Sequence, residues 1–448
     1  MVGKNRLNEW PICRRNQGPS GFHLRRIGRA HVGLVVAAAQ VLGCGDGKLE
    51  GVRIEEIANS ERHFSGTWWG YNMSKIVRRG DVVYRYNIEN DVPAGEPYAM
   101  TLYAKEGDRD WRRGASFTTS RPGNLLIDGE GKLHALVFEA ADMATNDSIG
   151  RLVHYESTEP GGIDAFKRDV VVPNDGSQET VNIRVGAAIS TSGRLVTGWG
   201  IRRPAPDKQS IEFYEKPPDA TGWTHLSGPT NLGHDFYYPF IVAPAWGIAS
   251  LHVQDDLVQP ENTNIYYRAD YFERRDGTWR QQTLVDRRNH PLAEQRNQIV
   301  EQSDLYLDGD GHLHAVVKER LDPDNPGDFS AIRHFVHDGD ELVEQGLLGV
   351  EQGRCNWVRL FEYDGALHFA CVTWRRLFVR RVGGQTVEIE LPRDATGTYL
   401  YVPTPRAGSE RNPQYLDLML VSGNSEAYPG GPAYYVQVPM ASLEVLAP

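Results

Sequence analysis

Long apolar runs and cysteines are both scarce in this 448-residue chain. The one extended apolar stretch, Val32–Gly43, is too short to span a bilayer as a stable anchor. Apolar residues do not recur at a helical period over long segments, which disfavours a helical fold. The four cysteines lack the spacing of a metal site, and we expect neither a metal nor a cofactor. A net charge of −11 disfavours nucleic acid and anionic lipid as partners.

The N-terminal region has the layout of an export signal. A basic cluster, His23–Arg29, precedes the apolar stretch, and Cys44 follows it. This arrangement is similar to a bacterial lipoprotein signal, in which Cys44 would be lipidated and provide the only membrane contact. Residues 1–22 make the leader longer than usual, so a start placed too early, or a buried strand or helix, stays an alternative. We expect a signal or leader (1–43), a spacer with a closing strand (44–65) and the main domain (66–448).

One pattern recurs along the chain: two short apolar segments joined by an acidic, glycine-containing turn. It is clearest at Asn124–Val137, Ser303–Val317 and Val358–Val372, with looser copies at Ala187–Gly200 and Phe240–Gln254. Aromatic and β-branched residues are common in these segments, while Gly and Pro are scattered throughout the chain. The pattern is typical of antiparallel hairpins made of short strands.

Each copy opens a longer unit that continues with a third and a fourth strand. The units begin near residues 74, 124, 187, 240, 304, 358 and 415, about 50–64 residues apart, which indicates a repeat architecture. Seven four-stranded antiparallel units at this spacing predict an all-β, seven-bladed β-propeller, which hides its edge strands by closing on itself. Gly51–Asn59 would supply the outer strand of the last blade. Six or eight blades stay open as alternatives, because the first and last units match least well.

Two cysteines flank one of the predicted hairpins. A turn at Asp364–Gly365 would place Cys371 opposite Val358, three residues from Cys355. We therefore expect no disulfide between Cys355 and Cys371 unless the strand bends.

Several histidines follow the predicted turns at a recurring position, namely His134, His252, His314 and His368. A residue that recurs in four units is explained by the repeat, as a side chain packed between blades and hydrogen-bonded there. One of them, His314, would share a strand region with His312, but we expect no metal there because no carboxylate can be placed beside the two.

The loops that do not repeat are the better candidates for function. In a propeller, the loops entering the inner strands and those joining second to third strands form one face. Here those loops are rich in arginine and aromatic residues, which suit an anionic ligand with sugar rings. The substrate-binding candidates are Arg121, Arg184, Arg202, Arg354, Trp357, Trp374 and Arg375, of which Arg184, Arg202 and Arg354 would clamp a carboxylate. Structural packing of arginine on aromatic rings stays the alternative.

His234 lies outside the repeat, next to Tyr237 and Tyr238. His and Tyr can serve as base and acid in the β-elimination of a uronic acid, where a cation beside the carboxylate acidifies the C5 proton. We therefore take His234 and Tyr237 as the catalytic candidates. A glycosidase would instead use two carboxylates or a tyrosine nucleophile, and the available carboxylates are Glu139, Asp235, Asp255 and Glu319.

The blade pattern over roughly residues 66–445 resembles the sialidase-like, BNR-repeat propellers, which include sialidases and polysaccharide lyases of the ulvan-degrading type. Only partial Asp-box sequences occur, at Asp276–Trp279 and Asp110–Trp111, and no Arg-Ile-Pro motif is present. The resemblance implies a carbohydrate-active protein. From the signal-like N-terminus we expect it to be exported to the bacterial cell envelope or exterior, and we expect a monomer. Our leading hypothesis is a lyase acting on, or a protein binding, an acidic polysaccharide. The alternatives are a non-catalytic cell-surface propeller that binds protein or glycan, and a glycoside hydrolase of sialidase-like fold.

Overall fold

The computed structural model describes the propeller and several of its loops. The residues described are 51–59, 70–89, 98–119, 122–142, 146–172, 179–180, 185–202, 210–229, 235–255, 266–290, 299–321, 331–348, 355, 357–373, 375–384, 386–392, 399–421 and 432–444. All of them belong to the larger of two compact units, residues 36–448. Residues 1–50, which include Cys44, lie outside the described residues.

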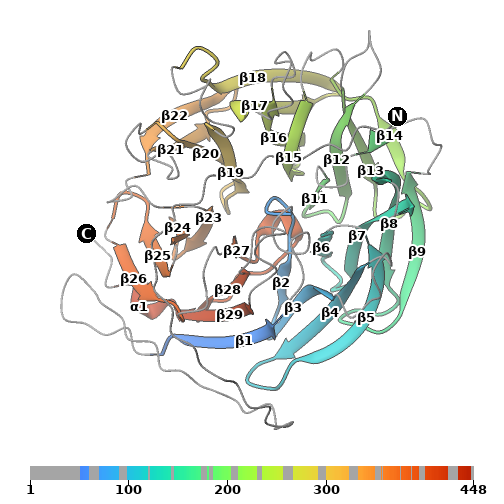
Figure 1. Ribbon diagram of the computed structural model, residues 1–448, viewed down its shortest axis with the longest axis vertical. Helices are drawn as coiled ribbons and strands as arrows, with labels where there is room; N and C mark the ends of the chain where they lie inside the picture. Colours follow the sequence, from blue (N-terminus) through green and yellow to red (C-terminus); the bar gives the residue numbers. More distant parts are fainter. Residues whose placement is uncertain are drawn as a thin grey trace, which may run out of the picture. The chain divides into compact units, whose positions relative to one another are not determined.

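Seven antiparallel sheets form the blades of a β-propeller, which confirms the seven-bladed prediction (Figure 1). The first blade contains β2 (Ile76–Arg79), β3 (Val82–Glu89), β4 (Tyr98–Glu106) and β5 (Arg112–Thr119). The second contains β6 (Asn124–Ile127), β7 (Leu133–Asp142), β8 (Asn146–Ser157) and β9 (Phe166–Val172). The third contains β10 (Glu179–Thr180), β11 (Gly186–Ile189), β12 (Leu195–Arg202), β13 (Ser210–Lys216) and β14 (Thr224–Leu226), with β10 and β11 both paired to β12.

The next three blades repeat the four-stranded plan. The fourth contains β15 (Asp235–Val242), β16 (Gly247–Asp255), β17 (Tyr266–Arg275) and β18 (Thr278–Asp286). The fifth contains β19 (Val300–Leu307), β20 (Leu313–Glu319), β21 (Ala331–His337) and β22 (Leu342–Leu347). The sixth contains β23 (Trp357–Tyr363), β24 (Ala366–Thr373), β25 (Arg376–Arg381) and β26 (Thr386–Glu390).

The seventh blade joins the two ends of the ring. Its order is β1–β29–β28–β27, so β1 (Arg53–Asn59) is its outer strand and pairs antiparallel with β29 (Pro432–Pro439) (Figure 1). The innermost strand is β27 (Tyr399–Tyr401), followed by the 3-10 helix η2 (Pro405–Ala407) and β28 (Tyr415–Val421). The expectation that this blade begins near residue 415 was therefore wrong. The three-residue β27 is joined to β28 by a long connection, so no short hairpin turn marks it in the sequence.

The C-terminal end of the described chain is helical. Residues Ala441–Glu444 form the short helix α1. Among the residues described, no helix has the length and the hydropathy that a membrane span requires.

The inner strands are buried on both faces because each blade packs against two neighbours. All four residues of β6 and of β11 are buried, and Leu125, Leu126 and Ile127 are fully inaccessible. Strands covered on both sides read as continuous apolar runs rather than as alternating ones. This accounts for the apolar character of the repeated hairpins.

The acidic turn of the repeat is a structural element. In the second blade, Asp128 Oδ1 accepts hydrogen bonds from the backbone N–H groups of Glu130 and Lys132, at 2.9 and 2.8 Å. Gly131 has a φ of 87°, a value that glycine adopts without the steric penalty of a side chain. The turn was correctly predicted, and its carboxylate stabilises the turn by accepting backbone hydrogen bonds.

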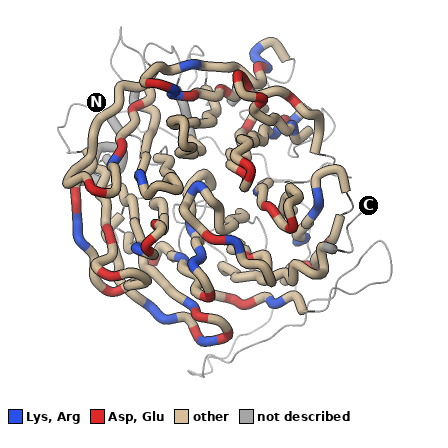
Figure 2. Tube along the Cα trace, turned by 180° about the vertical axis from the view of Figure 1, so that it is seen from behind, with Lys and Arg blue, Asp and Glu red and all other residues tan. Residues whose placement is uncertain are grey.

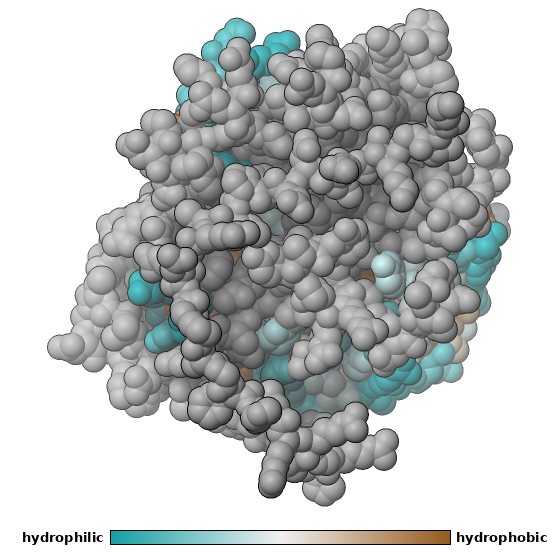
Figure 3. Space-filling view, in the orientation of Figure 1, coloured by the Kyte–Doolittle hydropathy of each residue, from teal (hydrophilic) through white to brown (hydrophobic). Residues whose placement is uncertain are grey.

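Charge is distributed around the whole ring. Acidic and basic residues are interspersed along the strands, both at the rim and toward the centre (Figure 2). In the space-filling view, most of the described atoms visible at the rim are hydrophilic (Figure 3).

Candidate functional site

Four aromatic side chains pack together on the face where the inner strands begin. We call Tyr71, Tyr238, Trp357 and Tyr399 the aromatic cluster. The ring centre of Tyr71 lies 4.5 Å from that of Tyr238 and 4.3 Å from that of Trp357. The Trp357 ring centre lies 4.8 Å from that of Tyr399. The four residues come from different blades, so the closed ring creates the cluster.

A local distortion of β15 positions Tyr238. The pairing of β15 with β16 is interrupted by a bulge directly after Tyr237, and Tyr238 has a φ of 51°. A left-handed backbone at a bulky residue costs about 1–3 kcal/mol, and it persists only where neighbours hold it. Here Gln302 Nε2 donates to the Tyr238 carbonyl at 2.6 Å, and Asn72 Nδ2 donates to the Pro239 carbonyl at 2.9 Å. The bulge is thus held by side chains from two other blades.

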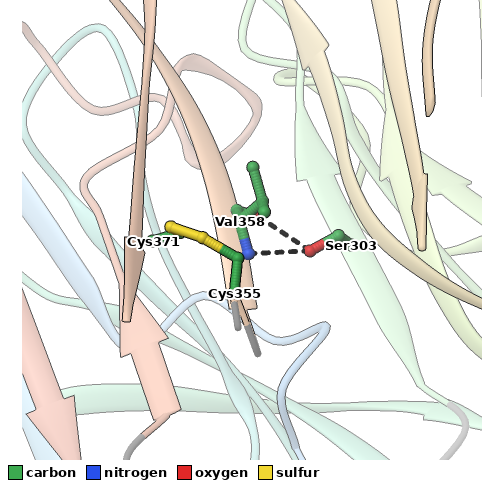
Figure 4. The surroundings of a disulfide bond; sticks show 4 residues. All are labelled: Ser303, Cys355, Val358 and Cys371. Atoms are coloured by element: carbon green, nitrogen blue, oxygen red, sulfur yellow. Dashed lines mark hydrogen bonds between the residues drawn. A yellow bond between two sulfur atoms is a disulfide. The ribbon is translucent and has the colours of Figure 1, made fainter. Parts of the chain in front are cut away.

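A disulfide holds the chain that leads into Trp357. Cys355 and Cys371 are bonded, with their Cα atoms 5.6 Å apart (Figure 4). The expectation of no disulfide was wrong, because Cys355 precedes the first paired residue of β23 and does not follow the ladder register. Ser303 Oγ, from β19, accepts from the Val358 N–H at 2.8 Å and donates to the Val358 carbonyl at 3.0 Å (Figure 4).

Charged groups lie directly beside the aromatic cluster. The Lys318 ammonium group is 3.9 Å from the centre of the Trp357 ring and 3.0 Å from Glu301 Oε2. Burial lowers the pKa of Lys318 to about 8, although Glu301 opposes that shift. Arg320 and Arg359 are close enough to lower that pKa further. Since Glu301 offsets one cation, these groups together leave an excess of positive charge.

The buried tyrosines of the cluster keep their protons. Burial raises the pKa of Tyr71 well above its usual value, and the Glu301 carboxylate adds to that shift. Burial likewise raises the pKa of Tyr399. The Tyr71 hydroxyl has no hydrogen-bond partner among the described residues. Its phenol is therefore a proton or hydrogen-bond donor at neutral pH, and it is unsuited to act as a base.

An ionic network adjoins the cluster at the backbone of Tyr71. Arg406 donates to Asp304 Oδ1 at 2.6 Å, and Asp304 Oδ2 accepts from the Leu360 N–H at 2.8 Å. The Arg359 guanidinium bonds to the backbone carbonyls of Ser303 and Tyr71. A cavity of about 10 Å³ lined by these groups has room for about one water molecule. The network ties the first, fifth and sixth blades to the segment around η2.

The site candidates taken from the sequence fall into three groups. Trp357 belongs to the aromatic cluster. Arg375 lies in the loop between β24 and β25, on the same face, and its Nε is buried without a hydrogen-bond partner among the described residues. Tyr237 and Arg202 are placed by their backbones in β15 and β12, pairing with Val253 and Glu179. The candidates outside the described residues are His234, Arg121, Arg184, Arg354 and Trp374.

Two of the carboxylates available for a glycosidase are engaged in ion pairs. Glu139 accepts from Arg151, Arg168 and Tyr155, and these hydrogen bonds hold its pKa below the usual value although burial opposes them. Glu319 is fully buried and bonds to Arg287 and Arg333. Neither is free to protonate a glycosidic oxygen. The side chains of Asp235 and Asp255 are not described, and their backbones pair with each other.

Lys318, Glu301 and Tyr399 are components of this face that sequence reasoning missed. A signal was present, because β19 contains the polar run Glu301–Asp304 in a strand that should be apolar on both faces. Lys318 similarly ends an apolar run in β20. Buried polar residues in a propeller's inner strands indicate that the channel side is chemically specialised.

Comparison with known proteins agrees with this architecture. No protein-family model and no curated protein sequence matches the chain. The structure is similar to a polysaccharide lyase of family PL25, an ulvan lyase, with a TM-score of 0.57 and 12% identity over 88% of this chain and 99% of that one. It is also similar to the polysaccharide lyase Uly1, with a TM-score of 0.54 and 10% identity over 86% and 99% of the two chains.

The likeness is one of fold. A Trypanosoma rangeli sialidase aligns with a TM-score of 0.42 and 14% identity over 75% of this chain and 55% of the sialidase. The two lyases, at 12% and 10% identity, show a shared propeller architecture and leave the activity to be argued from the site. The predicted resemblance to polysaccharide-lyase-like propellers is confirmed at that level.

Proposed function

We propose that this protein is exported and acts on an acidic polysaccharide, as a lyase that cleaves by β-elimination. The observation that carries the proposal is the packing of aromatic rings beside an excess of positive charge at one face. Aromatic faces stack on sugar rings, and cations bind the carboxylate of a uronic acid. The disulfide is consistent with an oxidising compartment outside the cytoplasm.

The chemistry requires three roles. A base removes the C5 proton, the electron pair forms the C4–C5 double bond, and the C4–O bond breaks while an acid protonates the leaving oxygen. We assign base and acid to His234 and Tyr237, as the sequence suggests. Arg320 would neutralise the carboxylate, and the buried Lys318 would add to the positive potential around it. That neutralisation acidifies the C5 proton.

A panel of uronic-acid polymers tests the assignment. We expect at least one polymer to yield unsaturated uronate, seen as a rise in ultraviolet absorbance with time. Lys318→Met should lower kcat/KM at least about tenfold, because it removes a cation from a desolvated site. Tyr415→Phe, on a strand of the last blade outside the cluster, is the control and should leave activity unchanged.

The alternatives give different results in the same assay. Binding of a polymer without turnover would replace the lyase with a non-catalytic glycan-binding propeller. Reducing ends without ultraviolet absorbance would indicate hydrolysis, which the ion pairs of Glu139 and Glu319 disfavour. Full activity in His234→Ala would remove only the role assigned to His234.

A further inference from the structure

A second cluster of polar side chains lies in the second blade, toward the opposite face from the aromatic cluster. His134, on β7, is directly opposite Glu156, on β8. His154 is two residues before Glu156 on the same strand, so both project from one face of the sheet. Ligand atoms of the three side chains lie within 4.8 Å of one another. They lie next to the hairpin turn at Asp128, which follows the end of β6. The aromatic cluster lies on the other face, where the inner strands begin.

The two imidazoles are oriented by an outer carboxylate. Asp128 Oδ2 lies 3.3 Å from His134 Nε2, so that nitrogen donates and Nδ1 carries the lone pair. His134 Nδ1 in turn lies 3.0 Å from His154 Nε2. A carboxylate bonded to the far nitrogen of a histidine is the usual outer partner of a metal-binding imidazole, because it fixes the tautomer and raises ligand basicity.

A cavity gives access to the cluster. Its volume is about 350 Å³, and His134 and Glu156 lie in its wall. The charged side chains that line it are Asp128, Glu130, Glu156, Asp219, Lys132 and Lys216. Four carboxylates against two ammonium groups leave an excess of negative charge, which favours a cation. Lys132 Nζ lies 3.6 Å from Glu156 and is partly exposed, so it can move aside.

The fifth blade contains the same arrangement without the third ligand. His314 Nδ1 lies 3.1 Å from His334 Nε2, and His314 Nε2 lies 3.1 Å from Asp308 Oδ2. The residue opposite His314, however, is Val336. The Asp–His–His arrangement is thus a repeated structural feature, and the carboxylate of Glu156 is what distinguishes the second blade.

We propose that His134, His154 and Glu156 bind one transition-metal ion of the zinc type. Two imidazoles and one carboxylate suit such an ion, and a fourth position would face the cavity. Zinc–nitrogen bonds of about 2.0–2.1 Å at a tetrahedral angle place two nitrogens about 3.3 Å apart. The imidazoles therefore need to separate by only a few tenths of an ångström. The ion takes the place of the hydrogen bond between the two rings, and the His154 proton moves from Nε2 to Nδ1, so both rings stay neutral ligands.

Metal titration of the chelator-treated, tag-free chain tests the proposal. We expect one equivalent of Zn²⁺ by calorimetry, and tetrahedral visible absorption with Co²⁺. Glu156→Val, which copies the fifth blade, should weaken binding at least tenfold. Asp128→Asn should weaken it about 10–100-fold, because the outer carboxylate is lost. Thermal unfolding of each variant verifies that the propeller is intact.

The fifth blade provides the matched control. Val336→Glu adds the missing carboxylate at a half-buried position, and the stoichiometry should rise from one to two equivalents. A stoichiometry that stays at one would show that these three ligands are insufficient. Absence of Zn²⁺ binding in the wild-type chain, or equal binding by Glu156→Val, would overturn the site. The readout is independent of enzymatic activity, so it is unaffected by failure of the lyase assignment.

Discussion

At the scale of single residues, Lys75 is the clearest case of a charge in an unfavourable place. It is buried just before β2, with its ammonium group 4.7 Å from the centre of the Tyr401 ring. Burial lowers its pKa to about 7. The unfolded chain holds that proton up to about pH 10.4, so between these values unfolding takes up a proton and stability rises with pH. Below the folded pKa both states are protonated, and the penalty of burial is fully present.

Replacing Lys75 should remove this pH dependence. Relative to Lys75→Met, the wild-type chain should gain on the order of 2 kcal/mol of unfolding free energy between about pH 7 and pH 9, at about 1.36 kcal/mol per pH unit. Urea denaturation across that range measures the difference. Lys167→Met, at an exposed position of β9, is the control and should follow the wild-type curve. Parallel curves for Lys75→Met and the wild type would contradict the assigned pKa.

At the scale of elements, the β23–β24 hairpin differs from the other inner hairpins because it is cross-linked. The bond joins residues 16 apart in sequence and holds the segment just before Trp357. Closing a loop of about 15 residues in the unfolded chain is worth about 3 kcal/mol in the chain-entropy account. The disulfide therefore stabilises the fold and positions one ring of the aromatic cluster.

Removing the cross-link should affect both properties. The double variant Cys355→Ser/Cys371→Ser should lose about 3 kcal/mol of unfolding free energy. It should also lose part of any polysaccharide affinity, since the Trp357 segment is no longer held. A reducing agent should reproduce the loss in the wild-type chain and leave the double variant unchanged. Equal stability of the two chains would show that the hairpin register alone holds this segment.

At the scale of the whole molecule, closure of the ring depends on β1. This strand pairs with β29 over Arg53–Asn59 and covers the outer edge of the last blade. It also contacts the first blade, where Lys105 Nζ lies 2.9 Å from Glu55. Without β1, the backbone groups of β29 would form an open edge, which promotes aggregation.

Two truncated chains test the contribution of β1 to ring closure separately from any contribution of the N-terminal residues before it. A chain that begins at Gly51 should unfold like the full-length chain. A chain that begins at residue 60 lacks β1, and it should unfold several degrees lower and aggregate on heating. Calorimetry and light scattering measure both properties. Equal melting temperatures for the two truncations would mean that the other six blades suffice to close the ring.

The sequence by itself determined the repeat and the strand type and favoured seven blades, because hairpins such as Asn124–Val137 have local signals in their apolar runs and turn residues. It could not reveal β27, a three-residue strand without a turn signal, nor the disulfide, since Cys355 lies outside the ladder that sets the register. Aromatic and basic residues were predicted for the face where the inner strands begin, and the aromatic cluster and Lys318 lie there. Only the tertiary structure decided which side chains meet there, because Tyr71, Tyr238, Trp357 and Tyr399 come from four blades. Their contacts depend on closure of the ring, and that is a long-range property that no local pattern encodes.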